Sequence, residues 1–238
     1  MRIVGLDLGQ SSVKIVEVDS SFGRYEIHDH REIPVPSGED PCAVAGLVLK
    51  TLAQPPQKLV VALRSSKLTT RNLQLPTRDR KAIRSAVTFQ LEDELPFSID
   101  DALMDSVILS QSAQTSQVHV AASLKKTFAP ELIKLNTADI DPDIITTDAW
   151  ALRTLVNRAL QPQEQEKPIL VAHIGSKSTL FYIHWRGFPM LGREISWGGD
   201  DLTEALAQRL GVPFERAESL KCNPSLLQEA QSENAITL

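Results

Sequence analysis

The chain has 238 residues and a formal net charge of −5 at pH 7, with 42% hydrophobic and 23% charged residues. These values are ordinary for a folded globular protein and allow one large domain or two modest ones. Nucleic-acid affinity rests largely on basic side chains that displace counterions, so this acidic chain is not expected to bind nucleic acid. The two cysteines, Cys42 and Cys222, exclude a disulfide framework and a cysteine metal cluster and suit a reducing cytoplasm. The uninterrupted apolar runs are far too short to cross a bilayer, so we expect a soluble cytosolic protein.

Apolar periodicity and turn residues predict a mixture of strands and helices along the chain. Short turns separate the first three strands and imply an antiparallel meander. The predicted strands are Arg2–Asp7, Ser12–Asp19, Arg24–Val35, Lys58–Arg64, Thr69–Leu75, Leu103–Ser110, Gln117–Ser123, Asp143–Thr146, Ile169–Ile174 and Ser178–Trp185. The predicted helices are Pro41–Ala53, Thr77–Leu95, Leu124–Ala138, Ala149–Leu160, Leu202–Leu210 and Phe214–Lys221. The polar, proline-bounded stretch 161–168 suits a linker between two lobes.

The predicted helix Thr77–Leu95 has Thr77 as a candidate cap and one apolar stripe, but its charges oppose the helix dipole. Its N-terminal end carries the basic residues Arg78, Arg80, Lys81 and Arg84, and its C-terminal end carries Glu92, Asp93 and Glu94. Two interpretations remain open, a solvated face and a polarised docking surface for a protein partner. The nearby Phe89 and Phe97 belong either to the core or to a peptide groove. The tryptophans Trp150, Trp185 and Trp197 are expected to be core anchors.

An internal repeat joins the two halves of the chain. The segment Val4–Val13 recurs in outline as Leu170–Thr179, each an apolar strand, a polar residue, a glycine and then hydroxyl residues. Glycine lets a backbone approach an anion closely, and hydroxyls such as Ser11, Ser12 and Ser178 can donate to phosphate. Asp7 could hold Mg²⁺ through water, and Lys14 could supply a positive charge. Taken singly, either turn is more often an ordinary hairpin, but the pair indicates two related lobes around a cleft.

The paired turns resemble those of the actin-like ATPase superfamily, in which two duplicated lobes clamp a nucleotide between two hairpins. Several segments carry a closer resemblance to the pilus-assembly platform family PilM and to the cytoplasmic region of the type II secretion family GspL, both related to the division protein FtsA. These segments are Gly5–Lys14, Glu92–Phe97, Asp148–Leu152, Gly192–Thr203 and Ala217–Lys221. The resemblance covers nearly the whole chain.

The resemblance implies an α/β, actin-like (ribonuclease-H-like) duplicated fold with an inserted α+β subdomain and an incomplete second lobe. The first lobe is expected over residues 1–64 and 126–162, the inserted subdomain over 65–125, and the partial second lobe over 163–238. ATP and Mg²⁺ are the implied cofactors, with Asp7 holding the metal through water. The residues that match the first phosphate turn by position are Asp7, Gly9, Ser11, Ser12 and Lys14. Those that match the second phosphate turn are Gly175, Ser178 and Thr179. The pair that contacts the nucleoside in the family is matched by Glu218 and Lys221.

Two departures bear on catalysis. His173 stands where the second turn of the family usually begins with aspartate. An imidazole with an ordinary pKa near 6.5 is mostly neutral at pH 7 and cannot replace a carboxylate in holding the water of Mg²⁺. The second lobe of the family also continues to a glycine-rich adenine contact, whereas this chain ends at Leu238. We therefore expect either a degenerate site or a fragment, and no catalytic residue is assigned.

The leading hypothesis is a non-catalytic platform at the cytoplasmic face of the bacterial inner membrane. It would link an inner-membrane assembly protein to the motor ATPase of a type IV pilus or type II secretion machine, and self-association is left open. The surface expected to meet a partner comprises Arg78, Arg80, Lys81, Arg84, Phe89 and Phe97. A working ATPase of the same fold is the first alternative. A sugar kinase is the second, but it would need a catalytic aspartate between the lobes, and no candidate stands out.

Overall fold

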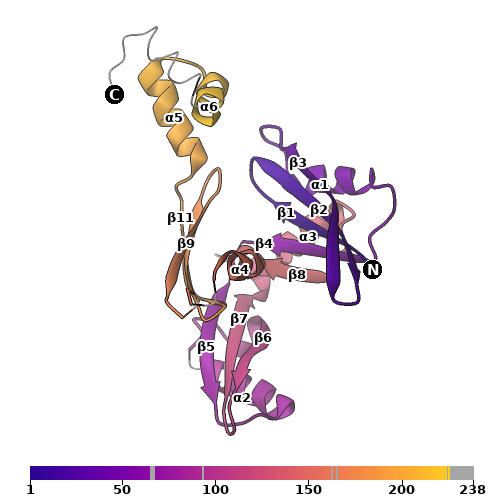
Figure 1. The fold of residues 1–238 in the computed structure, drawn as a ribbon, viewed down its shortest axis with the longest axis vertical. Helices are drawn as coiled ribbons and strands as arrows, with labels where there is room; N and C mark the ends of the chain where they lie inside the picture. The colour runs from indigo at the N-terminus through magenta and orange to yellow at the C-terminus, as the bar shows by residue number, and fades with distance from the viewer. Residues whose placement is uncertain (65–67, 93, 162, 165, 224, 226–238) are drawn as a thin grey trace. The chain divides into compact units, whose positions relative to one another are not determined.

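The structure is a computed structural model that describes residues 1–64, 68–92, 94–161, 163–164, 166–223 and 225. Strands and helices follow one another largely as the sequence predicts (Figure 1). The strands are β1 (Arg2–Leu8), β2 (Ser12–Ser21), β3 (Arg24–Pro34), β4 (Lys58–Leu63), β5 (Thr69–Leu75), β6 (Ala102–Gln111), β7 (Ser116–Leu124), β8 (Ile144–Thr147), β9 (Ile169–Ile174), β10 (Thr179–Trp185) and β11 (Phe188–Ile195). The helices are α1 (Pro41–Leu49), α2 (Arg80–Glu92), the short 3₁₀ helix η2 (Ile99–Asp101), α3 (Lys125–Thr137), α4 (Asp148–Ala159), α5 (Gly199–Leu210) and α6 (Phe214–Cys222).

The chain divides into two compact units. Unit 1 comprises Met1–Val171 and Phe181–Arg193, and unit 2 comprises Ala172–Leu180 and Glu194–Leu238. The lobe and subdomain boundaries expected from the sequence remain predictions. Every helix among the described residues is too short or too polar to span a lipid bilayer.

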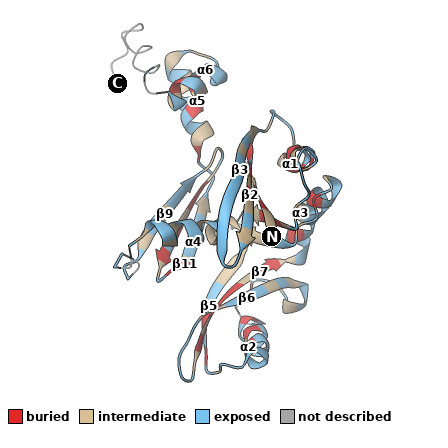
Figure 2. Cartoon of the chain, turned by 45° about the vertical axis from the view of Figure 1, so that its right-hand side comes forward, coloured by how far each residue is buried: buried red, intermediate tan, exposed pale blue. Residues whose placement is uncertain are grey.

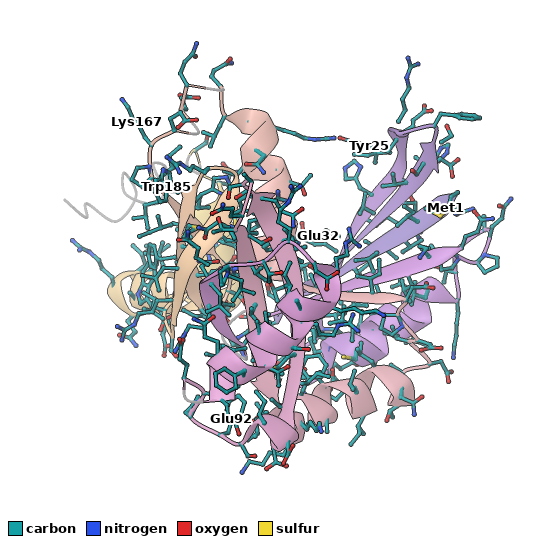
Figure 3. All side chains as sticks on the ribbon, turned by 90° about the horizontal axis from the view of Figure 1, so that it is seen from below. Met1, Tyr25, Glu32, Glu92, Lys167 and Trp185 are labelled. Atoms are coloured by element: carbon teal, nitrogen blue, oxygen red, sulfur yellow. The ribbon has the colours of Figure 1, made fainter. Side chains whose placement is uncertain are left out.

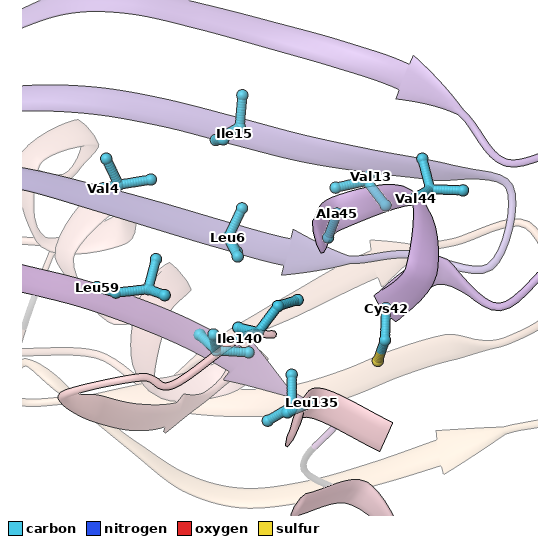
Figure 4. Packing of buried hydrophobic residues seen from close by; sticks show 11 residues of the cluster. Val4, Leu6, Val13, Ile15, Cys42, Val44, Ala45, Leu59, Leu135 and Ile140 are labelled. Carbon is cyan, nitrogen blue, oxygen red and sulfur yellow. The ribbon is translucent and has the colours of Figure 1, made fainter. Parts of the chain in front are cut away.

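The largest sheet of unit 1 has five strands in the order β3-β2-β1-β4-β8. The antiparallel meander predicted for β1, β2 and β3 is confirmed, and β4 pairs in parallel with both β1 and β8. Alternate side chains of a strand share one face, so β1 and β2 present a continuous apolar surface to α1 and α3. The buried core under these helices consists of Val4, Leu6, Val13, Ile15, Cys42, Val44, Ala45, Leu59, Val61, Leu135 and Ile140 (Figure 4).

Helix α1 is fixed at its start by a side-chain cap and at its end by close packing. The carboxylate of Asp40 accepts a hydrogen bond from the backbone N–H of Cys42 at 2.9 Å, and Pro41 supplies the first helical residue. Near the other end, a Cβ atom on Gly46 would lie 2.2 Å from the carbonyl oxygen of Ala138. Burial, reinforced by Asp40, raises the pKa of the Cys42 thiol to about 12, so this thiol stays protonated.

A second sheet of unit 1 has the antiparallel order β5-β7-β6 and is covered by α2. The predicted apolar stripe of α2 is confirmed, because Ile83, Val87 and Leu91 are buried against this sheet. Figure 2 shows α2 buried along one side and exposed along the other. The prediction of a Thr77 cap is wrong: the N–H of Ala82 in the first turn of α2 bonds to Asp79 Oδ1 at 2.8 Å.

The third sheet has the order β11-β10-β9. Strand β11 is absent from the sequence predictions, because Pro189 and Gly192 both weaken a strand. Its position at the edge of the sheet explains why it forms, since an edge strand tolerates a proline that cannot donate to the ladder. Helix α4 begins as predicted, with Thr147 Oγ1 accepting from the N–H of Trp150 at 3.2 Å.

Helix α5 of unit 2 begins at Gly199, earlier than the predicted Leu202. The Asp201 carboxylate accepts a hydrogen bond from the N–H of Gly198 at 2.7 Å and thereby stabilises this glycine-rich first turn. Gly211 ends the helix in the left-handed conformation at φ 66°. Ala217 and Leu220 of α6 are fully buried, which accounts for the contact between the two helices.

Candidate functional site

The turn between β1 and β2 is the first candidate phosphate turn. A Cβ atom on Gly9 would lie 2.5 Å from the carbonyl oxygen of Ser12, so the backbone leaves room only for glycine. Asp7 and Lys14 face each other across the two strands, and Lys14 Nζ lies 3.8 Å from Asp7 Oδ2. Both side chains are about half exposed, at 46% for Asp7 and 51% for Lys14. The carboxylate and the ammonium group are therefore accessible to a ligand.

The two predicted hydroxyls of this turn differ in their surroundings. Ser12 is buried, and its Oγ donates to Glu32 Oε1 at 2.6 Å and accepts from Lys14 Nζ at 3.1 Å. Ser11 is exposed. Glu32, labelled in Figure 3, also lies 3.7 Å from Lys14 Nζ. The Ser12 proton is thus committed to a carboxylate, and Ser11 is the hydroxyl that a ligand would reach.

Glu32 is a member of this turn that sequence reasoning missed. Its signal is the alternation of β3, which places it on the polar face, together with the register that sets it opposite Lys14. With Asp7 and Glu32 the turn carries two carboxylates against one ammonium group. A phosphate bound here would therefore need a cation to offset the repulsion. Nowhere in the described ranges do three His, Cys, Asp or Glu side chains gather to hold a metal, so Mg²⁺ at Asp7 would keep most of its water.

The second candidate turn, between β9 and β10 in unit 2, is closed by backbone hydrogen bonds. The N–H of Gly175 donates to the carbonyl of Ser178 at 2.9 Å. The N-terminus of α5 approaches the same turn, with the N–H of Gly199 donating to Gly175 at 2.9 Å and that of Asp200 donating to Ser176 at 2.7 Å. A Cβ atom on Gly198 would lie 2.5 Å from the Ser176 oxygen. The turn and the glycine pair before α5 therefore form one tight backbone unit.

The side chains of the second turn are unequally available. Thr179 is buried, and its hydroxyl donates to the carbonyl of Trp197 at 2.8 Å, so its proton is held within unit 2. Ser178 is partly exposed and His173 is exposed on β9. Trp197 itself is 47% exposed, so the expectation that it anchors a core is wrong. Of the three predicted phosphate contacts, only Ser178 presents an accessible group, because the N–H and the carbonyl of Gly175 are both held in backbone hydrogen bonds.

Glu218 and Lys221, the predicted nucleoside pair, belong to a compact polar cluster in unit 2. Lys221 Nζ lies 2.6 Å from Glu218 Oε2, 2.7 Å from Thr203 Oγ1 and 3.0 Å from the carbonyl oxygen of Gly199. The hydroxyl of Thr203, which is fully buried, also contacts the Glu218 carboxylate. Burial opposes ionisation of Glu218, but hydrogen bonds from Lys221, Thr203 and Cys222 outweigh it and hold its pKa below the usual range. The pair thus ties α6 to the start of α5.

The predicted partner surface is exposed along α2. Arg78, Arg80, Lys81 and Arg84 are all exposed, and none of the ion pairs formed between described residues involves them. Phe89 is 80% exposed, which rules out the core interpretation for this residue. Phe97 instead packs against the cluster that contains Ile83, so it is part of the core. Asp93 lies outside the described residues.

An aromatic and polar cluster that the sequence did not reveal joins the second and third sheets within unit 1. His119 on β7 stacks on Trp150 of α4, with ring centroids 5.2 Å apart, and its Nδ1 lies 2.8 Å from Asn72 Oδ1 on β5. Arg153 of α4 covers the ring of Phe188 on β11, with its guanidinium carbon 4.3 Å from the ring centroid. Burial lowers the pKa of His119, which therefore favours the neutral form. These elements are far apart in sequence, and no local pattern marks their contact.

The same cluster continues into β10. His184 is fully buried, and its Nε2 lies 2.8 Å from Asn157 Oδ1 of α4. The amide of Asn157 and the guanidinium of Arg153 both donate to the carbonyl of Gly187, at 3.0 Å and 2.6 Å. Burial, and then the charge of Arg153, lower the pKa of His184. The hairpin between β10 and β11 is thereby fastened to α4.

The architecture is the actin-like α/β fold, which confirms the fold class expected from the sequence. The ethanolamine utilization protein EutJ from Carboxydothermus hydrogenoformans aligns over 98% of this chain and 65% of its own, with a TM-score of 0.51 at 15% identity. The cytoplasmic domain of EpsL, an inner membrane component of the type II secretion system of Vibrio cholerae, aligns over 88% of this chain and 75% of its own, with a TM-score of 0.50 at 14% identity. At these identities the likeness concerns the fold.

Within this fold class the chain belongs to the family described as type IV pilus assembly protein PilM, whose sequence model matches residues 5–234. A solved PilM–PilN type IV pilus biogenesis complex agrees with this assignment. It aligns over 98% of this chain and 73% of its own, at 25% identity and with a TM-score of 0.73. The resemblance stated from the sequence motifs is confirmed.

Proposed function

We propose that the chain is a platform protein of a type IV pilus machine that grips a short cytoplasmic segment of an inner-membrane assembly protein. The observation that carries this proposal is the match over 98% of the chain to a PilM solved together with PilN. The family assignment over residues 5–234 supports it independently. The platform would work at the cytoplasmic face of the inner membrane, where such a segment is accessible. A type II secretion machine is the alternative setting, supported by the shared fold with EpsL.

The proposal extends to a second contact, with the motor ATPase of the same machine. A platform that binds both a membrane protein and a motor would couple the two without catalysing a reaction itself. The exposed edge strands and the charged exposed face of α2 offer surfaces for such contacts. This extension stands apart from the membrane contact, because either partner could bind without the other.

Co-purification with purified partners tests both contacts. The cytoplasmic N-terminal segment of the membrane assembly protein, fused to an affinity tag, should retain the chain on the resin, and a scrambled segment should not. The tagged motor ATPase should retain it in a parallel experiment. Retention by neither partner would contradict the platform proposal, whereas retention by the motor alone would remove only the membrane contact.

Nucleotide binding is a second candidate function, favoured by the glycine-constrained turns at Gly9 and Gly175. The accessible groups of the first turn fit magnesium and phosphate chemistry: Asp7 would hold Mg²⁺ through water, and Lys14 and Ser11 would contact phosphate oxygens. The Mg²⁺ of bound ATP would offset the excess negative charge that Asp7 and Glu32 place there. His173 leaves the second turn without the carboxylate that hydrolysis would use, so we propose binding without turnover.

Isothermal titration with ATP, with and without Mg²⁺, tests this candidate. We expect Mg²⁺-dependent binding that weakens on Asp7→Ala, since Glu32, the other carboxylate beside Lys14, is already hydrogen-bonded to the Ser12 hydroxyl. Lys126→Ala, at an exposed residue of α3 outside both turns, serves as the control. Binding that is indifferent to Mg²⁺ and to Asp7→Ala would contradict the assignment, and measurable ATP turnover would contradict the absence of catalysis.

A further inference from the structure

The solvent side of α2 carries a second stripe, distinct from the one buried in the core. Ala82, Ser85, Phe89 and Glu92 follow one another along α2 at spacings of three, four and three residues, and all are exposed. Arg78, which precedes the helix, is also exposed. This spacing keeps side chains on one side of a helix and is the pattern that two paired helices use at their seam. Ala82 and Ser85 are small, and Phe89, at 80% exposure, is the one large apolar side chain among them. The stripe therefore has one large exposed side chain, Phe89, beside two small ones, Ser85 and Ala82.

The charges on this stripe are bipolar. Lys81, next to Ala82, lies at the basic N-terminal end of α2, and Glu92 lies at its acidic C-terminal end. None of the ion pairs between described residues involves either side chain. The basic side chains lie at the positive N-terminal end of the helix dipole and the acidic ones at its negative C-terminal end. This distribution therefore does not stabilise an isolated α2. A partner helix of opposite polarity would complement both ends at once.

An antiparallel second copy of α2 has that polarity. A two-fold axis at the level of Val87 places Lys81 of each copy opposite Glu92 of the partner subunit. By symmetry this pair of opposite charges occurs twice. The same axis brings Phe89 over the small side chains of Ser85 of the partner subunit and Ala82 of the partner subunit. Charge and shape are thus self-complementary about one centre.

We propose that α2 is a self-association surface through which two copies of this chain pair antiparallel. The two-signed charge favours this occupant over an anionic lipid surface or a uniformly acidic peptide, because either of these would meet repulsion at Glu92 and Glu94. One helix face is far smaller than a standard interface of about 1,600 Å² in total, so the pairing should depend on concentration. The pairing needs no pilus partner, so it survives if the platform proposal fails.

A charge-swap experiment with the full chain tests the pairing. Lys81→Glu and Glu92→Lys should each weaken self-association at least about tenfold in sedimentation velocity, because each variant sets like charges against each other twice. An equimolar mixture of the two variants should associate again, since a Lys81→Glu copy and a Glu92→Lys copy complement each other at both ends. Restoration in the mixture cannot arise from misfolding of either variant.

A truncation adds an independent readout. Phe89→Ala should weaken self-association, whereas Phe22→Ala, which removes a fully exposed phenylalanine from the turn between β2 and β3, should leave it unchanged. A wild-type chain that stays monomeric at every accessible concentration would overturn the proposal, as would a mixture that associates no better than its components. Binding of monomeric chain to anionic vesicles that is lost in Lys81→Glu and kept in Glu92→Lys would assign the surface to lipid instead.

Discussion

Lys221 is the residue on which the polar cluster of unit 2 depends. Its ammonium group lies within 3.0 Å of oxygen atoms from Gly199, Thr203 and Glu218, and its side chain is only 20% exposed. Removing it would leave the Glu218 carboxylate and the partly exposed Gly199 carbonyl without their charged donor. The position assigned to nucleoside contact by resemblance is therefore also a structural tie between α5 and α6.

We predict that Lys221→Met destabilises unit 2 by about 1–2 kcal/mol, the usual loss when a charged hydrogen-bond donor is removed from its acceptors. The fluorescence of Trp197, which lies in unit 2, reports this unfolding in urea. Lys177→Met, at an exposed lysine of the same unit, should change the stability little. Equal effects of the two substitutions would contradict the role of the cluster.

The pH dependence of the same cluster has a definite sign. The folded chain holds the pKa of Glu218 below its ordinary value, so this carboxylate contributes stability above the ordinary carboxyl range and loses that contribution as the pH falls through the folded pKa. As the pH falls, the free energy of unfolding of Lys221→Met should therefore decrease less than that of the parent chain, because the variant lacks the lysine that lowers the Glu218 pKa.

Two buried histidines make the stability of unit 1 depend on pH in a milder range than the Glu218 carboxylate does in unit 2. Burial lowers the pKa of His119 and of His184, so the unfolded chain takes up protons more readily as the pH drops below about 6.5. We predict that the melting temperature of unit 1 falls between pH 7 and pH 5 and that His119→Phe, which keeps the stack on Trp150, reduces this fall. A pH profile that the substitution leaves unchanged would contradict the assignment.

Single-residue roles were only partly predictable from the sequence. The requirement for glycine at positions 9 and 175 follows from the turn motif. The partners of Ser12 and Thr179 do not, because Glu32 and Trp197 reach these hydroxyls through strand register and tertiary packing. Hydroxyl residues in a phosphate-like motif therefore cannot be assigned to a ligand from spacing alone.

At the scale of elements, α1 packs closely against the C-terminal end of α3, with Gly46 at the point of contact. Gly46→Ala should destabilise unit 1 by about 2–3 kcal/mol, because the added Cβ would lie 2.2 Å from the Ala138 carbonyl and α1 would have to shift. In an unobstructed helix the same change stabilises by about 1 kcal/mol, so the sign itself is diagnostic. Thermal unfolding measures it, with Leu47→Ala at a 67% exposed position of α1 as the control.

The elements that sequence reasoning placed well have strong periodicity, and the ones it missed break local rules. The stripe of Ile83, Val87 and Leu91 predicted the buried side of α2. Strand β11 contains a proline and a glycine and exists because it is an edge strand paired with β10. The first turn of α5 is rich in glycine and aspartate and becomes helical through the Asp201 bond to Gly198. Tertiary contacts, rather than propensity, decide both cases.

At the scale of the whole molecule, the family was predictable because its motifs are distributed along nearly the entire chain. The match of the PilM family over residues 5–234 confirms what those motifs indicated. The exposed α2 stripe and the aromatic cluster around Trp150 add surfaces and ties that no motif announced.

The central claim is that this chain holds a cytoplasmic segment of an inner-membrane pilus assembly protein. Isothermal titration of the chain with that segment tests it most directly, with a scrambled segment and the Phe22→Ala variant as controls. We predict saturable one-to-one binding of the native segment that Phe22→Ala, at an exposed residue away from α2, leaves intact and that the scrambled segment does not reproduce. Heats indistinguishable between the native and scrambled segments would contradict the account.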